Sequence, residues 1–230
     1  MTSTTIATRP TDCDRSTAVT RSLLGYGVLA GPAYVLVSLA QALTRDGFDL
    51  TRHSWSLLAN GPYGWVQITN FVLTGLMVVA FAVGLRRALR PGQGATWAPR
   101  LVGCYGAGLV AAGIFRADPA LGFPVGTPAD ARTISWHGAL HLAAGGVAFL
   151  CLTAACLVLA RRFAADGRRG WAVFSRVTGV VFLAAFAGIA SGSAGPATTL
   201  PFVAAVVLVS AWMSATAAHL YNHTAPPAGH

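Results

Sequence analysis

Two histidines that lie four residues apart, His137 and His141, are the side chains of this sequence best suited to chemistry. Residues at this spacing share one face of a helix, so both imidazoles can reach a single ion. Zinc sites use such pairs, and His53 or Asp118 could supply a third ligand. A zinc-bound water could then attack an ester or an amide, with Asp118 as ligand or base. The catalytic candidates are therefore His137, His141 and Asp118, and the metal candidates are His137, His141 and His53.

The second histidine pair of the chain, His219 and His223, weakens the metal interpretation. It has the same spacing, yet no acid or further histidine lies near it in the sequence. A pair of this kind therefore occurs here without the ligands that a metal needs. In the competing interpretation, the first pair hydrogen-bonds to polar side chains around it: Gln67, Asn70 or Asp118. On this interpretation the protein holds no cofactor, and zinc is the alternative.

Arginines offer a different chemistry at the start of the helix that Trp136 opens. Arg116, Arg52 and Arg132 fall in segments expected to meet this positive helix end. A helix N-terminus together with guanidinium groups binds phosphate or carboxylate. We therefore expect an anionic headgroup or a carboxylate at this position. An ion pair between Arg116 and Asp118 at the membrane interface is the plainer interpretation of those two side chains.

The composition excludes a water-soluble globule. Of the 230 residues, 54% are hydrophobic and only 10% are charged, whereas a typical soluble domain has roughly 25% charged residues. The formal net charge is +9, from 16 cationic and 7 acidic side chains. The cationic side chains are all arginines in short clusters between long apolar runs. This pattern is typical of a multi-pass membrane protein and argues against nucleic acid as the partner.

Six runs of about 20 mostly apolar residues are long enough to cross a membrane as helices. They cover residues 22–43, 65–85, 97–115, 135–160, 171–191 and 200–220. The third run depends on Arg100 extending to the interface. We therefore predict an all-α, polytopic membrane bundle of six transmembrane helices, formed by residues 21–221. Residues 1–20 are expected to be a disordered cytoplasmic segment, and residues 222–230 a short cytoplasmic tail.

The placement of arginines predicts the orientation of this bundle. Twelve arginines fall in the N-terminal segment and in the second and fourth loops with their flanks, whereas four fall on the other side. Because the side richer in arginine stays in the cytoplasm, both termini are predicted to be cytoplasmic and the protein to lie in the plasma membrane. Its basic clusters are expected to contact anionic membrane lipids.

Polar side chains recur in the outer halves of the predicted helices. Ser38 and Gln41 end a small-residue stripe on the first helix, and Gln67, Asn70 and Thr74 share a face of the second. A polar group in hydrocarbon must face the bundle interior or find a partner, which predicts an outward-facing polar pocket. The expected ligand-binding residues are Gln67, Asn70, Arg116, Asp118, His137, His141, Arg52 and Trp136. Close packing with hydrogen bonds across helices is the structural alternative.

Three segments together resemble a known family. They are HSWSLLANGPYGWVQITNFVLTGL (residues 53–76), GIFRADP (113–119) and SWHGALH (135–141). Their order and spacing resemble the Ser-x-Leu and Gly-Trp-x-x-x-x-Asn-Phe segment, the Asp-Pro turn and the His-Gly-x-x-His helix entry of an uncharacterised bacterial multi-pass membrane family, catalogued as domain of unknown function 998. The resemblance implies a six-helix membrane protein and no established activity. Its motifs coincide with the predicted polar pocket, which favours a shared site.

These observations leave three functions open. The first is a membrane protein whose pocket binds a lipid headgroup or a small polar ligand. The second is an intramembrane, metal-assisted hydrolase that uses His137 and His141. The third is an accessory structural subunit of a membrane complex, whose polar residues only pack helices. The sequence does not decide whether the protein is an enzyme, and it defines neither the ligand nor the oligomeric state.

Overall fold

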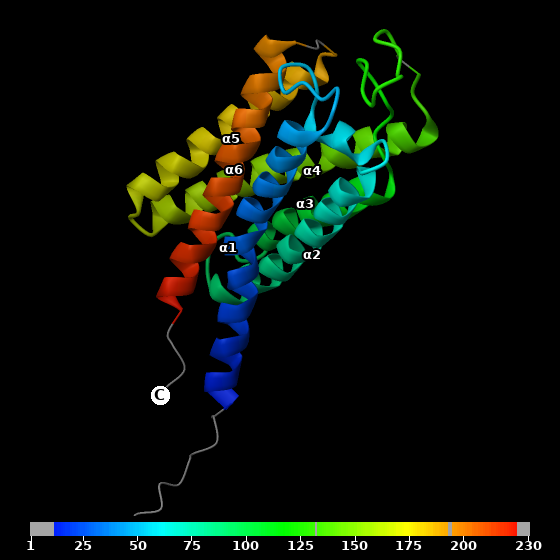
Figure 1. Cartoon of the computed structure of the whole chain (residues 1–230). Coiled ribbons are helices and arrows are strands. Elements are labelled where there is room, and N and C mark those ends of the chain that lie inside the picture. The colour runs from blue at the N-terminus through cyan, green and yellow to red at the C-terminus, as the bar shows by residue number, and fades with distance from the viewer. Residues whose placement is uncertain (1–11, 132, 193–194, 225–230) are drawn as a thin grey trace, which may run out of the picture.

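The computed structural model describes residues 12–131, 133–192 and 195–224, and these residues form an all-helical fold without a β-strand. The helices are α1 (Asp12–Thr44), the 3₁₀ helix η1 (Trp55–Ala59), α2 (Gly64–Ala88), α3 (Trp97–Ile114), α4 (Trp136–Ala165), α5 (Arg169–Ala190) and α6 (Pro196–His223). The predicted all-α class is therefore confirmed, and each predicted apolar run has become one of the six α-helices (Figure 1).

Five of these helices are long and apolar enough to cross a membrane: α1, α2, α4, α5 and α6. The helix α3 has 18 residues and spans about 27 Å at 1.5 Å per residue, slightly less than a hydrocarbon core of about 30 Å. It also carries the exposed Arg100 in its first turn, which lowers its hydropathy. That α3 also crosses the membrane therefore stays a prediction, and it depends on Arg100 extending to the interface.

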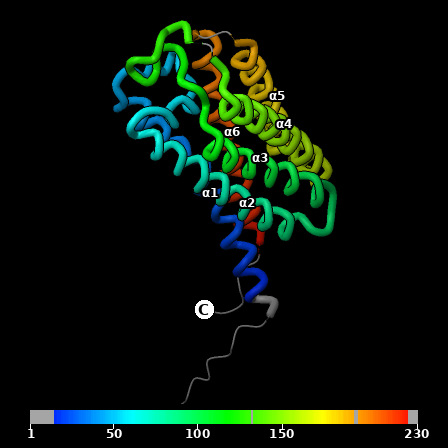
Figure 2. The backbone as a smooth tube through the Cα atoms, turned by 90° about the vertical axis from the view of Figure 1, so that its right-hand side faces the viewer, coloured from blue at the N-terminus to red at the C-terminus, as the bar shows by residue number. Residues whose placement is uncertain are grey.

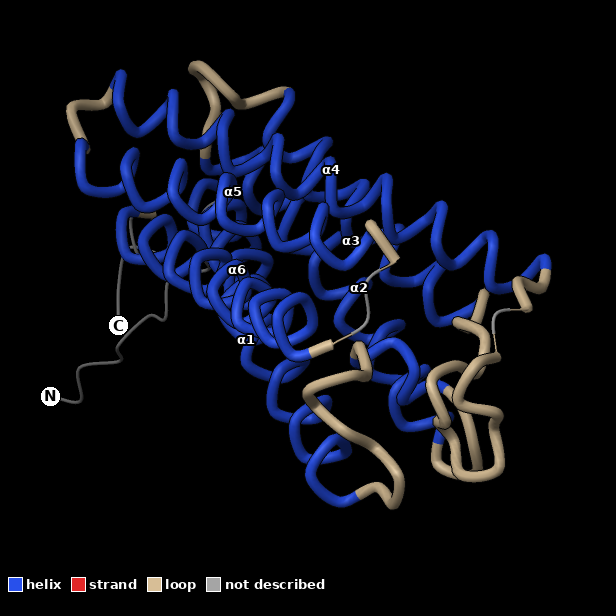
Figure 3. The backbone as a smooth tube through the Cα atoms, turned by 90° about the horizontal axis from the view of Figure 1, so that it is seen from above, coloured by secondary structure: helices blue, strands red, loops and turns tan. Residues whose placement is uncertain are grey.

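The six α-helices form a closed ring. Each helix packs against its neighbours in the chain, and α6 returns to pack against α1. The alternation is up and down: α1, α3 and α5 run one way, and α2, α4 and α6 the other (Figure 1). Both described ends of the chain lie at one end of the bundle, which we call the termini end. The connections 45–63, 115–135 and 191–195 lie at the opposite end, which we call the mouth end; Figure 3 looks down on it.

Glycines let neighbouring helices in this ring approach closely. A Cβ atom on Gly75 of α2 would lie 2.6 Å from the carbonyl oxygen of Gly106 on α3, and one on Gly106 would lie 2.8 Å from that of Gly75. At the α1–α6 contact, a Cβ on Gly31 would lie 2.7 Å from the Ser210 carbonyl oxygen. Since lipid offers no hydrophobic driving force between helices, this close backbone contact is what holds the ring together.

The termini half of the ring is filled by side chains. Trp212 and Phe81 are buried there, and the Trp212 indole nitrogen donates a 2.9 Å hydrogen bond to Ser175 across the α5–α6 contact. The aliphatic residues packed in the same core are Leu85, Leu152, Leu159, Val78 and Val102. This half is therefore a packed core, and any open space in the ring must lie toward the mouth end.

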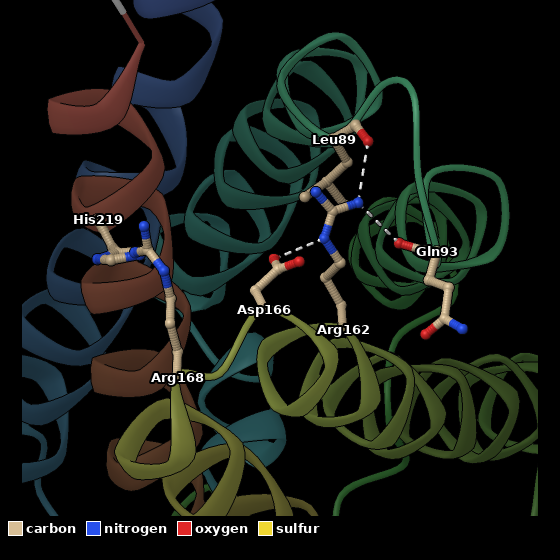
Figure 4. A network of polar contacts seen from close by, with 6 residues as sticks. All are labelled: Leu89, Gln93, Arg162, Asp166, Arg168 and His219. Atoms are coloured by element: carbon tan, nitrogen blue, oxygen red, sulfur yellow. Dashed lines mark hydrogen bonds and ion pairs between the residues drawn. The ribbon is translucent and has the colours of Figure 1, made fainter.

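An arginine fastens the connection between α2 and α3 to the termini end of α4. Arg162 donates hydrogen bonds of 3.2 Å each to the carbonyl oxygens of Leu89 and Gln93, and it forms a 2.7 Å ion pair with Asp166 (Figure 4). Nearby, Arg168 contacts His219 on α6. These charges lie at a bundle end, where water and headgroups solvate them, so they stabilise the loop arrangement.

The helix α1 begins earlier than the sequence indicated. It starts at Asp12, inside the segment 1–20 that was expected to be disordered, and its beginning extends beyond α2 and α3 (Figure 2). Contacts to other helices explain this extension, because Arg87 of α2 donates to Thr20 at 2.8 Å and Arg21 donates to the carbonyl oxygen of Thr224 at 2.8 Å. Residues 1–11 and most of the predicted tail, residues 225–230, lie outside the described part of the chain.

Candidate functional site

A cavity of about 1000 Å³ lies inside the ring toward the mouth end, and we call it the ring cavity. All six α-helices contribute side chains to its wall, and the first two mouth connections contribute to its rim. Its volume is at the upper limit of typical small-molecule pockets, which are about 300–1000 Å³. The ring cavity is therefore the candidate binding site of this fold.

The inner wall of the ring cavity is apolar. On this wall, Phe149 of α4 contacts three other phenylalanines. The centroid of its ring lies 5.3 Å from that of Phe182, 5.2 Å from that of Phe186 and 5.7 Å from that of Phe202. On α6 the wall continues to Val209, which is 13 residues beyond the start of that helix and so about 20 Å along it. The predicted pocket was polar, whereas this interior suits the apolar part of a ligand.

One stripe of α4 lines the ring cavity from the rim inward. Gly138, His141, Leu142, Gly145 and Phe149 follow the spacing of a single helix face. Gly145 contributes open space, because a Cβ atom built there would meet no heavy atom within 4 Å. The SWHGALH motif therefore leads directly into the cavity wall, with its second histidine at the rim.

Polar groups of the first connection form one side of the rim. Arg52 and Ser54 line the cavity, and the exposed Arg52 guanidinium uses one donor, at 3.3 Å, on the Leu121 carbonyl oxygen. Trp55 lines it too; this side chain is only 4% exposed, and its buried indole nitrogen has no hydrogen-bond partner. The remaining N–H groups of the exposed Arg52 are donors that a ligand can satisfy.

A partly buried arginine holds this connection in place. Arg45 donates to the carbonyl oxygens of Leu58 at 2.7 Å and Asn60 at 2.6 Å, and its guanidinium lies 5.1 Å from the centre of the Phe123 ring. Burial lowers the pKa of Arg45 from its usual value, and the carbonyl oxygens compensate for the lost water. Asn60 in turn donates to the Ala117 carbonyl oxygen at 3.0 Å, which joins the first connection to the second.

His53 belongs to this scaffold and not to a metal site with the other histidines. Its Nδ1 accepts a 2.9 Å hydrogen bond from the backbone N–H of Asp49, so Nε2 carries the proton and donates to the Leu121 carbonyl oxygen at 3.1 Å. Its ring packs between Phe48 and Phe123. Both nitrogens are therefore occupied, and His53 offers no free lone pair as a third ligand.

The two motif histidines meet different surroundings. His141 is buried at the cavity rim, and its Nδ1 donates to the Phe115 carbonyl oxygen at 2.8 Å, which leaves Nε2 as an acceptor. His137 packs on Trp136 with ring centroids 3.6 Å apart, and its Nδ1 is buried without a partner. Neither His137 nor Trp136 lines the cavity. The expected bonds from His141 to Gln67, Asn70 or Asp118 are replaced by bonds to backbone carbonyl oxygens.

The described ranges of the chain contain no group of three or more histidine, cysteine or acidic side chains that could hold a metal. Around His141 the remaining polar partners are backbone carbonyl oxygens of α3 and its end, Ala112 and Phe115. Zinc prefers nitrogen and sulfur ligands in a tetrahedral set, and this arrangement supplies one free imidazole nitrogen. The described side chains therefore do not form the metal centre that the hydrolase interpretation needs.

Asp118 supports the N-cap of α4, which is Ser135. Its carboxylate accepts hydrogen bonds from the N–H of Ser135 at 2.8 Å and from the Ser135 hydroxyl at 2.5 Å, and that hydroxyl accepts from the N–H of Gly138 at 3.1 Å. Gly138 leaves room for the Asp118 carboxylate because it has no Cβ atom; a Cβ atom at this position would overlap the carboxylate. The expected ion pair between Asp118 and Arg116 does not form among the described residues, since both carboxylate oxygens bond to Ser135 and Arg116 is exposed.

A model of the family described as "Protein of unknown function (DUF998)" matches residues 28–219. This chain belongs to the DUF998 family. The match covers α2 to α5 in full, most of α6 and about half of α1, and it includes every helical residue of the cavity wall. Neither the curated proteins nor the solved structures contain a match to this chain. The resemblance inferred from the three motifs is thereby confirmed.

The two predicted amides of this DUF998 protein lie outside the ring cavity. Gln67 accepts a 2.8 Å hydrogen bond from the side chain of Gln41, and Asn70 donates at 3.1 Å to Ser38 and at 3.2 Å to the Tyr34 carbonyl oxygen. All of these groups are buried between α1 and α2. The polar stripe that indicated a pocket is therefore a hydrogen-bond network between two helices, as the structural alternative described.

Of the eight predicted ligand-binding residues, Arg52, Asp118 and His141 line the ring cavity of this DUF998 protein, and the other five do not. The sequence analysis missed the aromatic wall. Phe149, Phe182 and Phe202 carried no signal, because a phenylalanine facing lipid and one facing an internal apolar cavity are equivalent in hydropathy. Trp55 had a signal, since this aromatic residue lies between two serines in the first mouth connection.

Proposed function

We propose that this DUF998 protein is a plasma-membrane binding protein for an amphipathic ligand, whose apolar part fills the ring cavity and whose polar head lies at the rim. The observation that carries the proposal is the division of one cavity into an aromatic inner wall around Phe149 and a rim where the exposed Arg52 has unused donors. A small polar ligand suits this interior poorly, because burying polar groups without partners is costly.

The head is expected to be rich in hydrogen-bond acceptors. Arg52 presents a guanidinium with five N–H donors, of which one is used on the Leu121 carbonyl oxygen. Asp118, the acid at this rim, has both oxygens engaged by Ser135 and lies at the positive end of α4. Phosphate and carboxylate match these donors, which supports the anionic headgroup expected from the sequence.

The mouth end is proposed to face away from the cytoplasm. Of the 16 arginines, twelve lie on the side of the chain termini and four on the side of the mouth connections. With six crossings, this imbalance places both termini in the cytoplasm. The rim would then lie at the outer surface of the membrane.

Filling the cavity tests the proposal. Gly145→Phe projects a ring into the open space of the cavity. Gly25→Phe on α1 is the control: a Cβ atom there also meets nothing within 4 Å, but Gly25 does not line the cavity. Each protein is purified in mild detergent, and the lipids it retains are counted by native mass spectrometry. We expect Gly145→Phe to retain about tenfold less of the bound amphiphile, equivalent to about 1.4 kcal/mol, and Gly25→Phe to match wild type.

Two results would contradict this proposal. One is equal retention by wild type, Gly145→Phe and Gly25→Phe, which would place any bound lipid outside the ring cavity. The other is the absence of any species that survives purification with the wild-type protein and reappears when membrane lipid extract is added back.

A further inference from the structure

The rim of the ring cavity has a second, apolar side. Residues that line the cavity and are also exposed mark its openings. On this side they include Ile134 and Leu142, with 67% and 62% of their surface exposed, the exposed Ala190 at the end of α5, and the exposed Thr133 beside Ile134. The polar side at Arg52 and Ser54 belongs to a different connection of the mouth end. An apolar opening is unfavourable toward water but compatible with lipid.

The lengths of α4 and α5 explain why the cavity opens here. Phe149 of α4 packs against Phe186 of α5 with ring centroids 5.2 Å apart, and α5 ends at Ala190, one turn later. Because the two helices are antiparallel, the first two turns of α4, which begin at Trp136, extend past the end of α5. Among the described residues, the cavity wall is therefore incomplete beside Leu142 and Gly145.

This opening lies at membrane depth. Trp136 opens α4 and is 65% exposed, as an aromatic side chain at the membrane interface is. Leu142 follows six residues later on α4, about 9 Å further along the helix at 1.5 Å per residue. If Trp136 marks the interface, the exposed Leu142 side chain contacts acyl chains. The glycine below it, Gly145, leaves the passage into the cavity free of side chains.

We propose that the occupant of the ring cavity is a lipid of the surrounding bilayer, and that its acyl chain enters sideways between the start of α4 and the end of α5. This inference rests on the proposed function and adds the ligand class and its route. The acyl chain passes Leu142 without leaving the hydrocarbon, while the head stays at interface level and reaches the donors of the polar rim. A ligand from water would instead cross the side formed by Arg52 and Ser54.

The rate of entry from a bilayer tests this route. The protein is reconstituted in vesicles of phosphatidylethanolamine and phosphatidylglycerol, and a cyclodextrin then delivers phosphatidylglycerol with a diazirine on one acyl chain to those vesicles. Samples are irradiated at successive times, and cross-linked peptides that contain Phe149, Phe182 or Phe202 report the filled cavity. Leu142→Trp narrows the apolar opening. Leu140→Trp is its matched control on the same helix, because Leu140 is exposed and lies outside the cavity wall.

We expect cavity cross-links to appear about tenfold more slowly in Leu142→Trp, which corresponds to an added barrier of about 1.4 kcal/mol, and at the wild-type rate in Leu140→Trp. Equal rates in all three proteins would overturn sideways entry while leaving the ring cavity as the binding site. Slower entry in Ser54→Trp but not in Leu142→Trp would likewise overturn it, in favour of entry from water. No cavity cross-link in the wild type, in vesicles or in detergent, would instead reject the proposed function.

Discussion

At the scale of single residues, side chains of the same chemical type have different tasks in this protein. Asp118 and His141 both lie at the cavity rim, but the carboxylate of Asp118 is committed to capping α4, whereas His141 keeps a free Nε2. Trp55 and Trp136 are both aromatic residues of the mouth end, yet one is buried with an unused donor and the other is exposed. Burial and hydrogen bonding, not residue type, therefore decide which of these side chains are open to a ligand and which only support the fold.

The cap formed by Asp118 gives a prediction at this scale. Asp118→Ala removes the acceptor for Ser135 and the negative charge at the start of α4, so we expect the free energy of unfolding to fall by about 1 kcal/mol. Thermal unfolding in detergent measures this change. Asp130→Ala is the control, because Asp130 is an exposed acid in the same connection. An equal loss in both variants would show that Asp118 has no capping role.

At the scale of elements, the pairing of helices divides the polar residues into two groups. The α1–α2 pair encloses the amide network of Gln67, Asn70 and Ser38, and the α3–α4 pair with its connection presents His141 and Asp118 to the cavity. Each buried amide in hydrocarbon needs a partner, and the neighbouring helix supplies it. The first group therefore stabilises the ring, and the second group lies where a ligand can contact it.

This division predicts that stability and binding respond separately. Gln67→Leu leaves Gln41 and Ser38 without their acceptor, so the free energy of unfolding should fall by about 1–2 kcal/mol. Retention of the amphiphile should stay at the wild-type level after correction for unfolded protein, because Gln67 does not line the cavity. Thr69→Leu, at an exposed position of the same helix, serves as the control. If Gln67→Leu lost the amphiphile but kept wild-type stability, Gln67 would belong to the binding site and this prediction would be wrong.

At the scale of the whole molecule, the ring is dense at one end and hollow at the other. The packed half around Trp212 holds the six helices together, and the mouth half encloses the cavity. Small residues draw the helices close in both halves, and Gly108 of α3 does so against Ala148 while lining the cavity. Gly145, on the same wall, contributes open space instead. A closed ring with one hollow end supports the proposed binding role, because the packed half holds the helices around the open half.

The orientation of the ring can be tested directly. In a variant without native cysteines, Ala129→Cys places a thiol in the exposed second mouth connection, and Ala165→Cys places one at the exposed end of α4. With six crossings and cytoplasmic termini, a membrane-impermeant maleimide added to intact cells should label the first and not the second. The reverse pattern would contradict the orientation. Labelling of both positions from outside would show that α4, which connects them, does not cross the membrane.

The sequence by itself determined the helices, their order and the membrane as their solvent. The predicted runs 65–85 and 171–191 became α2 (Gly64–Ala88) and α5 (Arg169–Ala190), because long apolar runs between arginine clusters and turn residues admit no other structure in a bilayer. It also located the motif that forms the rim of the site, through Asp118 and His141.

Only the tertiary structure decided which apolar side chains face lipid and which face the ring cavity. Hydropathy is the same for both, so Phe149 and Phe182 were indistinguishable from lipid-facing phenylalanines until α6 closed the ring against α1. The same closure separated the amides Gln67 and Asn70 from the cavity, because their partners lie on α1. Local spacing fixes the face of a helix, whereas the neighbour that each face meets depends on how six helices pack at once.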